Sequence, residues 1–439
     1  MSEAIGGAGG GDVRAGGVTR LGQLLEERKI VICCGSGGVG KTTTSASIAL
    51  AAALAGRRAV VCTIDPARRL ANSLGLSELG NEVIEVAPER LRAAGLEPRG
   101  RLYALMLDTK GTFDRLIERY AGDEERRQRI LANKFYQQMS STVVGSSDYM
   151  AMEKLYELFE EGRFDLIVLD TPPTKHALDF LQAPRRMTEA FDENMLQVFL
   201  KPWAEAGVKS LGFLGRAIGR LVTKVDEVIG LKFVEDFADF FRAFEGMYDG
   251  FRARAGRVDA LLREPFTSFV VVTSPQPLPL AEAGFFCERL REFEMRLDAV
   301  IVNRVQPSTL ADDGPREALR ARLRAQGPHE VLREVEGAAA KVAAPSPLLG
   351  AALRAFLDQE LHAAGDRLRI EGLAQGPGRG VLVQEVPSFA RDVHDIDGLR
   401  HLVERLFPDV GAGAPAGSGA ASTAGPSASD DAPPGQVTS

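Results

Sequence analysis

Residues 29–43 read Lys-Ile-Val-Ile-Cys-Cys-Gly-Ser-Gly-Gly-Val-Gly-Lys-Thr-Thr. The first six form a short, mostly apolar run, as expected of a buried strand, and an alanine-rich segment of helical composition follows the loop and ends near Gly56. A strand, a glycine-rich loop and a helix in this order are the context that a phosphate-binding loop (P-loop) requires. The alternative, a glycine-rich turn that binds nothing, does not explain why the complete pattern occurs in this context.

Each residue type in this loop has a physical reason. Its glycines allow the backbone to turn N–H groups towards an anion, and the positive end of the following helix faces the phosphates. We expect Lys41 to reach the β- and γ-phosphates of ATP and act in catalysis, Thr42 to bind Mg²⁺ and Thr43 to contact the α-phosphate. The predicted nucleotide contacts in this loop are Gly35, Gly37, Gly38, Val39, Gly40, Lys41, Thr42 and Thr43.

Two aspartates follow strand-like runs elsewhere in the chain. Asp170 ends the apolar run Phe164–Asp170 and precedes a Thr-Pro-Pro-Thr segment, so we expect it to hold magnesium through a water molecule. Asp65 follows the run Arg58–Ile64, where a carboxylate could position and deprotonate the water that attacks the γ-phosphate. Asp65 also precedes a proline and could cap the next helix, and the two roles are compatible.

Short runs rich in apolar and β-branched residues alternate with helical segments along the chain. They are Lys29–Cys34, Arg58–Ile64, Arg101–Leu107, Phe164–Asp170, Ser268–Thr273, Asp298–Asn303 and Gly380–Val386. Several are apolar on both faces, which is typical of strands in the middle of a parallel sheet covered by helices. The pattern predicts an α/β fold with a doubly wound, mostly parallel sheet of the P-loop NTPase type, whose ligands lie at the carboxyl ends of the strands.

Two stretches, about 109–161 and 186–262, show helical periodicity without strands. In the second, two amphipathic helices are predicted, each with apolar residues three or four positions apart. The first has Leu211, Leu214, Ile218, Leu221, Val225 and Val228, and the second has Phe233, Phe237, Phe240, Phe241, Phe244 and Tyr248. These helices either pack on the sheet or form a groove that closes over a hydrophobic client. We expect a P-loop ATPase domain over 23–408 with an inserted α-helical subdomain, a flexible tail over 1–22 and a disordered tail over 409–439.

Composition limits the classes of partner. The chain is 45% hydrophobic and 26% charged, with a net charge of −7 and no basic tract, so no nucleic-acid partner is expected. No apolar stretch approaches the ~20 residues that a membrane span needs. The four cysteines, Cys33, Cys34, Cys62 and Cys287, lack metal-ligand spacing and are interpreted as reduced core residues. We expect a cytoplasmic protein, with peripheral membrane contact as an option.

Three motifs taken together resemble a known family. They are Gly-Gly-Val-Gly-Lys-Thr-Thr at 37–43, Asp-Pro-Ala at 65–67 and Asp-Thr-Pro-Pro-Thr-Lys-His-Ala-Leu-Asp-Phe-Leu at 170–181. Over about residues 28–407, the chain resembles the arsenite-pump (ArsA-like) ATPases and, equally, the ATPases that target tail-anchored membrane proteins. Both belong to the deviant-Walker-A group of P-loop proteins.

The resemblance implies roles for individual residues. Asp65 matches the catalytic acid of switch I, and residues 170–176 match switch II. Asn303 matches the asparagine that contacts adenine, and Pro387 matches the late adenine loop. The resemblance also implies a dimer that closes on ATP and Mg²⁺ and switches a helical region that carries a hydrophobic client or contacts a membrane partner.

The sequence departs from the family pattern in ways that affect partner and cargo. The family's loop begins Gly-Lys-Gly-Gly, and its first lysine reaches the partner's nucleotide, whereas this chain has Ser36. We therefore expect either a homodimer or a heterodimer with a paralogue that keeps the lysine. No cysteine pair follows Asn303 to hold zinc, and no cysteine falls in the helical subdomain, where clustered thiols would bind arsenite.

Other function classes stay open. One is an ATPase that drives an arsenite or anion pump. Another is a partitioning or positioning switch, which normally carries a basic membrane helix or a DNA-binding surface. The end of this chain, Arg-His-Leu-Val-Glu-Arg-Leu-Phe-Pro at 400–408 followed by a tail, does not match that pattern. An iron–sulfur electron donor of the same superfamily would need paired cysteines.

Overall fold

The computed structural model describes most of the chain between Leu21 and Gly411. The described residues are 21–64, 69–77, 79–134, 136–137, 140, 146–172, 181–186, 236, 239–240, 243, 247–310, 313–327, 330–331, 333–335, 337–338 and 347–411.

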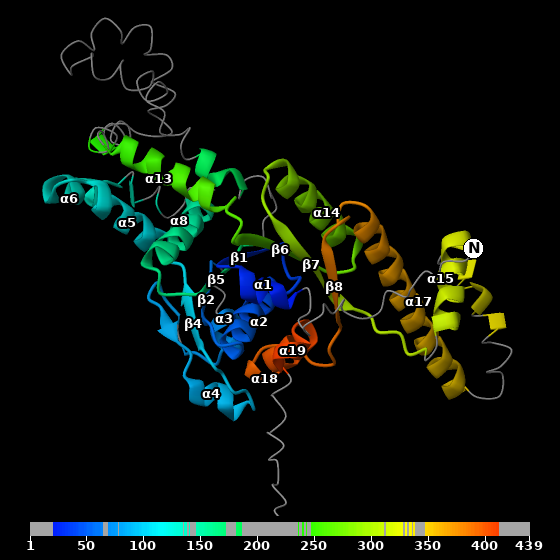
Figure 1. Cartoon of the computed structure of the whole chain (residues 1–439). Helices are drawn as coiled ribbons and strands as arrows, with labels where there is room; N and C mark the ends of the chain where they lie inside the picture. Colours follow the sequence, from blue (N-terminus) through cyan, green and yellow to red (C-terminus); the bar gives the residue numbers. More distant parts are fainter. Residues whose placement is uncertain are drawn as a thin grey trace, which may run out of the picture.

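The core is an eight-stranded sheet in the order β3-β4-β2-β5-β1-β6-β7-β8 (Figure 1). Its strands are β1 (Ile30–Cys34), β2 (Arg58–Thr63), β3 (Ile84–Glu85), β4 (Arg101–Met106), β5 (Leu166–Asp170), β6 (Thr267–Thr273), β7 (Leu297–Val305) and β8 (Leu382–Pro387). All neighbours pair in parallel except β3, which runs antiparallel to β4. The seven predicted strands are confirmed. The two-residue β3 was missed because it is too short to show a pattern.

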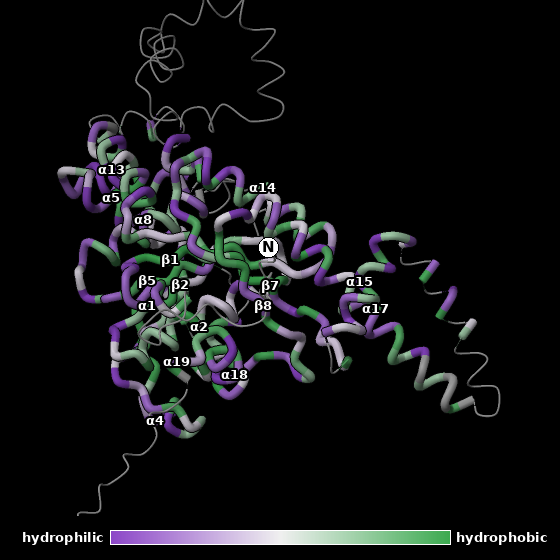
Figure 2. The backbone as a smooth tube through the Cα atoms, turned by 45° about the vertical axis from the view of Figure 1, so that its right-hand side comes forward, coloured by the Kyte–Doolittle hydropathy of each residue, from purple (hydrophilic) through white to green (hydrophobic). Residues whose placement is uncertain are grey.

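Helices cover both faces of the sheet because its central strands are buried on both sides. Every residue of β1, β5 and β6 is buried. One face packs against α1 (Gly22–Glu27), α2 (Lys41–Leu54), α3 (Arg69–Ser73), α4 (Pro88–Ala93) and α18 (Ile396–Leu406), with α19 (Pro408–Gly411) beside them. The other packs against α5 (Thr109–Tyr120), α6 (Glu124–Ala132), α8 (Ser146–Glu161), α13 (Tyr248–Leu261) and α14 (Pro277–Glu292). Figure 2 shows the hydrophobic strands at the centre of these helices.

The stretch predicted to be helical over 109–161 contains α5, α6 and α8, with breaks that have local causes. Asp108 and Asp123 each cap a helix by accepting a hydrogen bond from a backbone N–H three residues later, at 3.0 and 2.7 Å. Gly122, with φ 76°, allows the turn between α5 and α6. Of the second stretch, α13 is described, and residues 187–235, which include Leu211 to Phe233, lie outside the described residues.

A third helical region, α15 (Asp313–Gln326) and α17 (Pro347–Gln375), separates β7 from β8 and was missed in the sequence. The pair extends away from the sheet beyond β8 (Figure 1). Two buried carboxylates hold α17 to the chain that leaves β7. Glu360 accepts hydrogen bonds from the Ser308 hydroxyl and the Thr309 backbone N–H, both at 2.6 Å, and Asp366 accepts one from the Gln306 backbone N–H at 2.9 Å.

The ends of the folded part differ slightly from the expected boundaries. Leu21 is buried and Gly22 belongs to α1, although both fall in the segment that the sequence assigned to the N-terminal tail. At the other end, α19 continues to Gly411 rather than stopping at 408, and Val410 packs on the core. Apolar side chains in short terminal segments therefore extend the domain by a few residues at each end.

Candidate functional site

The P-loop connects β1 to α2, and close packing explains two of its glycines. Gly35 has φ 146°, and a Cβ there would lie 2.0 Å from the Val272 carbonyl oxygen. Gly40 has φ 97°, and a Cβ there would lie 2.4 Å from the amide nitrogen of Asn303. Gly37 and Gly38 are exposed at the tip. Because Gly40 provides no side-chain cap, the N–H groups of the first turn of α2 are available for an anion.

Lys41, the first residue of α2, is buried, and its ammonium group points back into the loop. Its Nζ donates a hydrogen bond to the Ser36 carbonyl at 2.8 Å. Val39 is buried beneath the loop, whereas Thr42 and Thr43 are half-buried in the first turn of the helix. The loop therefore holds a cation beside the N–H groups of the first turn of α2, which is an arrangement that binds phosphate.

Asp170 lies next to the P-loop because β5 is the neighbour of β1 in the sheet. It pairs with Cys33 of β1 on one side and Thr63 of β2 on the other. Its Oδ2 accepts hydrogen bonds from Thr42 Oγ1 at 2.7 Å and from Thr63 Oγ1 at 2.8 Å. The structure thus brings together the predicted pair Thr42 and Asp170. The sequence had not singled out Thr63 as the second hydroxyl, since its role depends on strand order.

These oxygen atoms fit a magnesium ion. Hydroxyl and carboxylate oxygens are hard donors that suit Mg²⁺, which usually takes only one or two protein ligands and completes its shell with phosphate and water. In the part of the chain that the structure describes, no group of three or more His, Cys, Asp or Glu side chains could hold a metal. That finding is compatible with a magnesium site in which Thr42 and Asp170 are the residues that the protein supplies.

Asn303 and Pro387 lie on neighbouring strands. The Asn303 amide donates to the Val39 carbonyl at 3.0 Å, so the end of β7 contacts the P-loop. Asn303 also accepts a hydrogen bond at 2.9 Å from the N–H of Arg304, whose φ of 60° coincides with an irregularity in the pairing of β7 with β8. Pro387 ends β8 and pairs with Val305 of β7. Both predicted adenine contacts therefore belong to the strands on the same edge of the P-loop.

Part of the predicted site lies outside the described residues. Asp65 and the three residues after it belong to this group, as do residues 173–180 of the segment that resembles switch II. Thr171, the described residue after Asp170, is buried and donates from its hydroxyl to the Cys33 carbonyl at 2.9 Å.

Ser36, which stands where the family has lysine, contacts a residue that the sequence gave no reason to select. Its hydroxyl donates a hydrogen bond to the Glu282 carboxylate of α14, 246 positions further along the chain. No spacing or motif could have identified Glu282, because the contact depends on how α14 packs beside β6.

The four cysteines are buried and free. Burial raises the pKa of Cys33 and Cys62 to about 12 and that of Cys287 to about 11, and it raises the pKa of Cys34 well above the usual value. The thiols are therefore protonated at neutral pH, whereas the thiolate is the form in which cysteine acts as a ligand, for example of arsenic(III).

This predicts slow thiol chemistry in the native protein. At pH 8, a disulfide reagent such as DTNB should modify none of the four cysteines within minutes, and all four after unfolding in guanidinium. The absorbance of the thiolate released from the reagent measures the reaction of the native protein and that of the unfolded protein. Rapid reaction of a native thiol, slowed by added arsenite, would instead indicate an accessible metalloid site.

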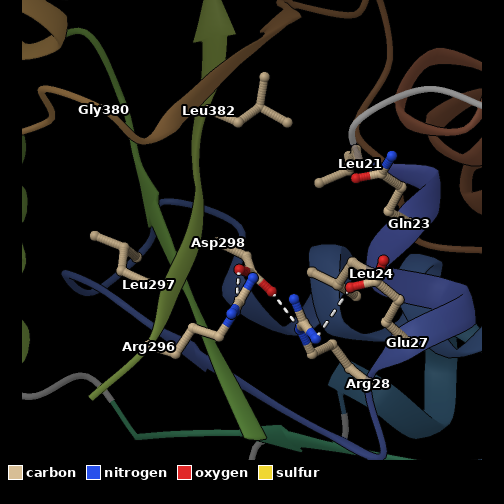
Figure 3. A pocket seen from close by; sticks show the side chains of 10 residues that line it. All are labelled: Leu21, Gln23, Leu24, Glu27, Arg28, Arg296, Leu297, Asp298, Gly380 and Leu382. Carbon is tan, nitrogen blue, oxygen red and sulfur yellow. Dashed lines mark hydrogen bonds and ion pairs between the residues drawn. The ribbon is translucent and has the colours of Figure 1, made fainter. Parts of the chain in front are cut away.

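A cavity of about 280 Å³ lies at the opposite, amino end of the sheet, between α1 and the starts of β7 and β8 (Figure 3). Asp298 accepts hydrogen bonds there from Arg28 at 2.6 Å and Arg296 at 2.7 Å. Burial raises the pKa of Asp298, but the two arginines outweigh it and hold that pKa below its usual value. Because ligands of parallel sheets bind at the carboxyl ends of strands, we assign this cavity a structural role.

Sequence comparison identifies the family. The profile described as anion-transporting ATPase matches residues 28–341. The chain belongs to the anion-transporting ATPase family. It is therefore an ATPase with the α/β fold of that family, as the sequence predicted.

Individual relatives share about a quarter of their residues with this member of the anion-transporting ATPase family. ATPase get3 of Schizosaccharomyces pombe is 25% identical over 288 residues, 65% of this chain and 76% of the relative. ATPase GET3A of Arabidopsis thaliana is 26% identical over 304 residues, which are 69% of this chain and 73% of the relative. A protein of Aquifex aeolicus with the provisional name arsenical pump-driving ATPase 1 is 26% identical over 289 residues, 64% of each chain.

Among the described residues, no helix combines the length and the apolar character needed to cross a bilayer.

Proposed function

We propose that this ATPase depends on magnesium, that it works as a dimer closing around nucleotide, and that it switches a helical client-binding region. The proposed binding of magnesium and nucleotide is supported by the group that Thr42, Thr63 and Asp170 form. Two hydroxyls meet one buried carboxylate oxygen at 2.7 and 2.8 Å, directly beside the P-loop.

Each residue has a role in this proposal. Backbone N–H groups of the P-loop and Lys41 bind the phosphates, and Lys41 neutralises charge that develops on the γ-phosphate. Thr42 and Asp170 would hold magnesium, which supplies positive charge to the β- and γ-phosphates. Asp65 orients the attacking water and accepts its proton. Asn303 and Pro387, on the strands beside the loop, contact the adenine.

The client region would include α5, α6, α8 and α13, together with the apolar stripe between 186 and 262. Support comes from the resemblance of the motifs and from the way these helices form a layer over one face of the sheet. The dimer is either a homodimer or a heterodimer with a lysine-bearing paralogue. A cytoplasmic location and the absence of a nucleic-acid partner stay predictions from composition.

A second candidate is a pump-driving ATPase for arsenite or another anion. The name of the Aquifex aeolicus relative favours it. The burial and raised pKa values of the four cysteines count against a thiol site for arsenite, so an anion pump would have to bind its cargo by other groups.

Magnesium titration of ATP turnover tests the proposal. In Asp170→Asn, the concentration of Mg²⁺ needed for half-maximal turnover should rise about tenfold or more, since an indirect metal contact is typically worth that much. Asp165→Asn is the matched control, because Asp165 precedes the same strand and pairs with Arg58 far from the site. Identical magnesium curves for wild type and Asp170→Asn would contradict the assignment.

A further inference from the structure

The Asp170 carboxylate is held by hydroxyl groups from two different parts of the fold. Thr42, in the first turn of α2, and Thr63, the last residue of β2, both donate to the same oxygen, Oδ2, at 2.7 and 2.8 Å. Asp170 is 1% exposed and Thr63 is 2% exposed. Hydrogen bonds to a charged acceptor are stronger than those between neutral groups, so both hydroxyls help to determine how this carboxylate lies.

The strand order gives the two threonines different relations to the nucleotide. Thr42 directly follows the P-loop, whereas Thr63 lies one strand further away, because β5 separates β2 from β1 in the sheet (Figure 1). Thr42 is therefore placed to contact an ion that is bound to the phosphates. The position of Thr63 favours a role that acts through Asp170 rather than on the ion itself.

The sheet fixes the position of the Thr63 hydroxyl. Thr63 pairs with Asp170 of β5 on one side and with Met106 of β4 on the other. Its carbonyl accepts a hydrogen bond from the Leu107 N–H at 2.8 Å. Because threonine is branched at Cβ, its χ1 rotamer is restricted as well. The hydroxyl therefore meets the carboxylate from a rigid element.

Magnesium chemistry makes the orientation of this carboxylate important. The ion demands nearly ideal octahedral geometry and keeps several of its waters, so a carboxylate that holds it through a water has to be well oriented. Groups that orient a metal-binding side chain commonly affect metal affinity strongly for this reason.

We propose that Thr63 is a positioning residue for magnesium. Its hydroxyl holds the Asp170 carboxylate in the orientation that binds the water shell of the ion, and Thr63 itself contacts neither the ion nor the nucleotide. The inference rests on the proposed function, in which Asp170 holds magnesium, and adds to it the residue that orients Asp170.

Thr63→Val tests this role, because it removes the hydroxyl and keeps the branched shape of the side chain. The full-length protein is titrated with a fluorescent, non-hydrolysable ATP analogue at a series of magnesium concentrations and in EDTA, so that binding is measured without turnover. The magnesium concentration that gives half of the metal-dependent gain in affinity should rise about tenfold. Affinity for the analogue in EDTA should equal that of the wild type.

Two further variants distinguish positioning from a general loss of stability. Thr63→Ser keeps the hydroxyl and should restore the magnesium dependence of the wild type. Thr267→Val makes the same chemical change at another buried threonine, whose hydroxyl donates to the Leu261 carbonyl at 2.7 Å at the start of β6. It should leave the magnesium dependence unchanged, whatever its melting temperature. Equal magnesium curves for Thr63→Val and Thr267→Val would overturn the inference.

A second pair of variants keeps the test decisive if Thr63→Val does not fold. Thr63→Ala and Thr63→Ser lack the same methyl group and differ only in the hydroxyl. Thr63→Ala should need about tenfold more magnesium than Thr63→Ser. The same magnesium dependence in both would show that the hydroxyl has no positioning role.

A double-mutant cycle tests whether Thr63 acts through Asp170. The variant Thr63→Val/Asp170→Asn should need no more magnesium than Asp170→Asn alone, since the residue that Thr63 orients is already lost. Additive losses would mean that Thr63 acts on the ion or the nucleotide by another route, which contradicts the inference.

The outcomes separate this inference from the proposed function. A weaker response to magnesium in Asp170→Asn but not in Thr63→Val would contradict the inference alone. An unchanged response in Asp170→Asn would contradict the proposed magnesium site and, with it, the role of Thr63.

Discussion

Lys41→Ala is expected to lower ATP turnover about a thousandfold, the upper range for removing one group that stabilises developing charge in a preorganised site. Lys41 is only 7% exposed, and its Nζ is held 2.8 Å from the Ser36 carbonyl. The cation is therefore in position before substrate arrives, and no side-chain entropy is lost at the moment of reaction. Steady-state phosphate release measures the effect.

The fold should survive this change, which allows the loss of turnover to be interpreted. Lys41 is the first residue of α2, where alanine is well tolerated. Circular dichroism and the melting temperature should therefore match wild type. Lys29→Ala is the control, because Lys29 is exposed at the opposite end of β1. Retained turnover in Lys41→Ala would remove the main support for the phosphate assignment.

Arg254→Ala is expected to destabilise the protein by about 3–5 kcal/mol, the usual cost of removing one partner from a buried ion pair. Arg254 of α13 is 2% exposed and lies between two carboxylates of α8. It donates from Nε to Glu153 at 2.8 Å and pairs with Glu160 at 2.5 Å, and its guanidinium group lies 4.1 Å from the centre of the Tyr156 ring. Without Arg254, the buried Glu153 carboxylate loses the cation that is hydrogen-bonded to it.

Urea unfolding followed by circular dichroism tests this prediction. Arg252→Ala, at an exposed position of the same helix, should change the free energy of unfolding by less than about 0.5 kcal/mol. The double variant Glu153→Gln/Arg254→Met also removes the buried Glu153 carboxylate, so it should recover much of the lost free energy of unfolding. Equal stability of Arg254→Ala and Arg252→Ala would show that the ion pair contributes little to the packing of α8 on α13.

The roles of Lys41 and Arg254 differ in how far the sequence could predict them. Lys41 belongs to a motif of contiguous residues whose geometry is local, so strand, loop and helix could be predicted together. Arg254 gave no signal, because arginine is normally exposed and nothing in the local pattern indicates a buried pair. The helices α15 and α17 were likewise not anticipated.

The sequence by itself determined the P-loop and the seven longer strands, because each depends on periodicity or spacing over a few residues and local backbone geometry fixes these. The family followed from the resemblance of three motifs. Three sets of hydrogen bonds were decided only by the tertiary structure. Thr63 and Thr42 both donate to Asp170. Asn303 donates to Val39, and Ser36 donates to Glu282. Those contacts join residues more than 100 positions apart. They follow from which strand neighbours which in the sheet, and that order is set by the packing of the whole core.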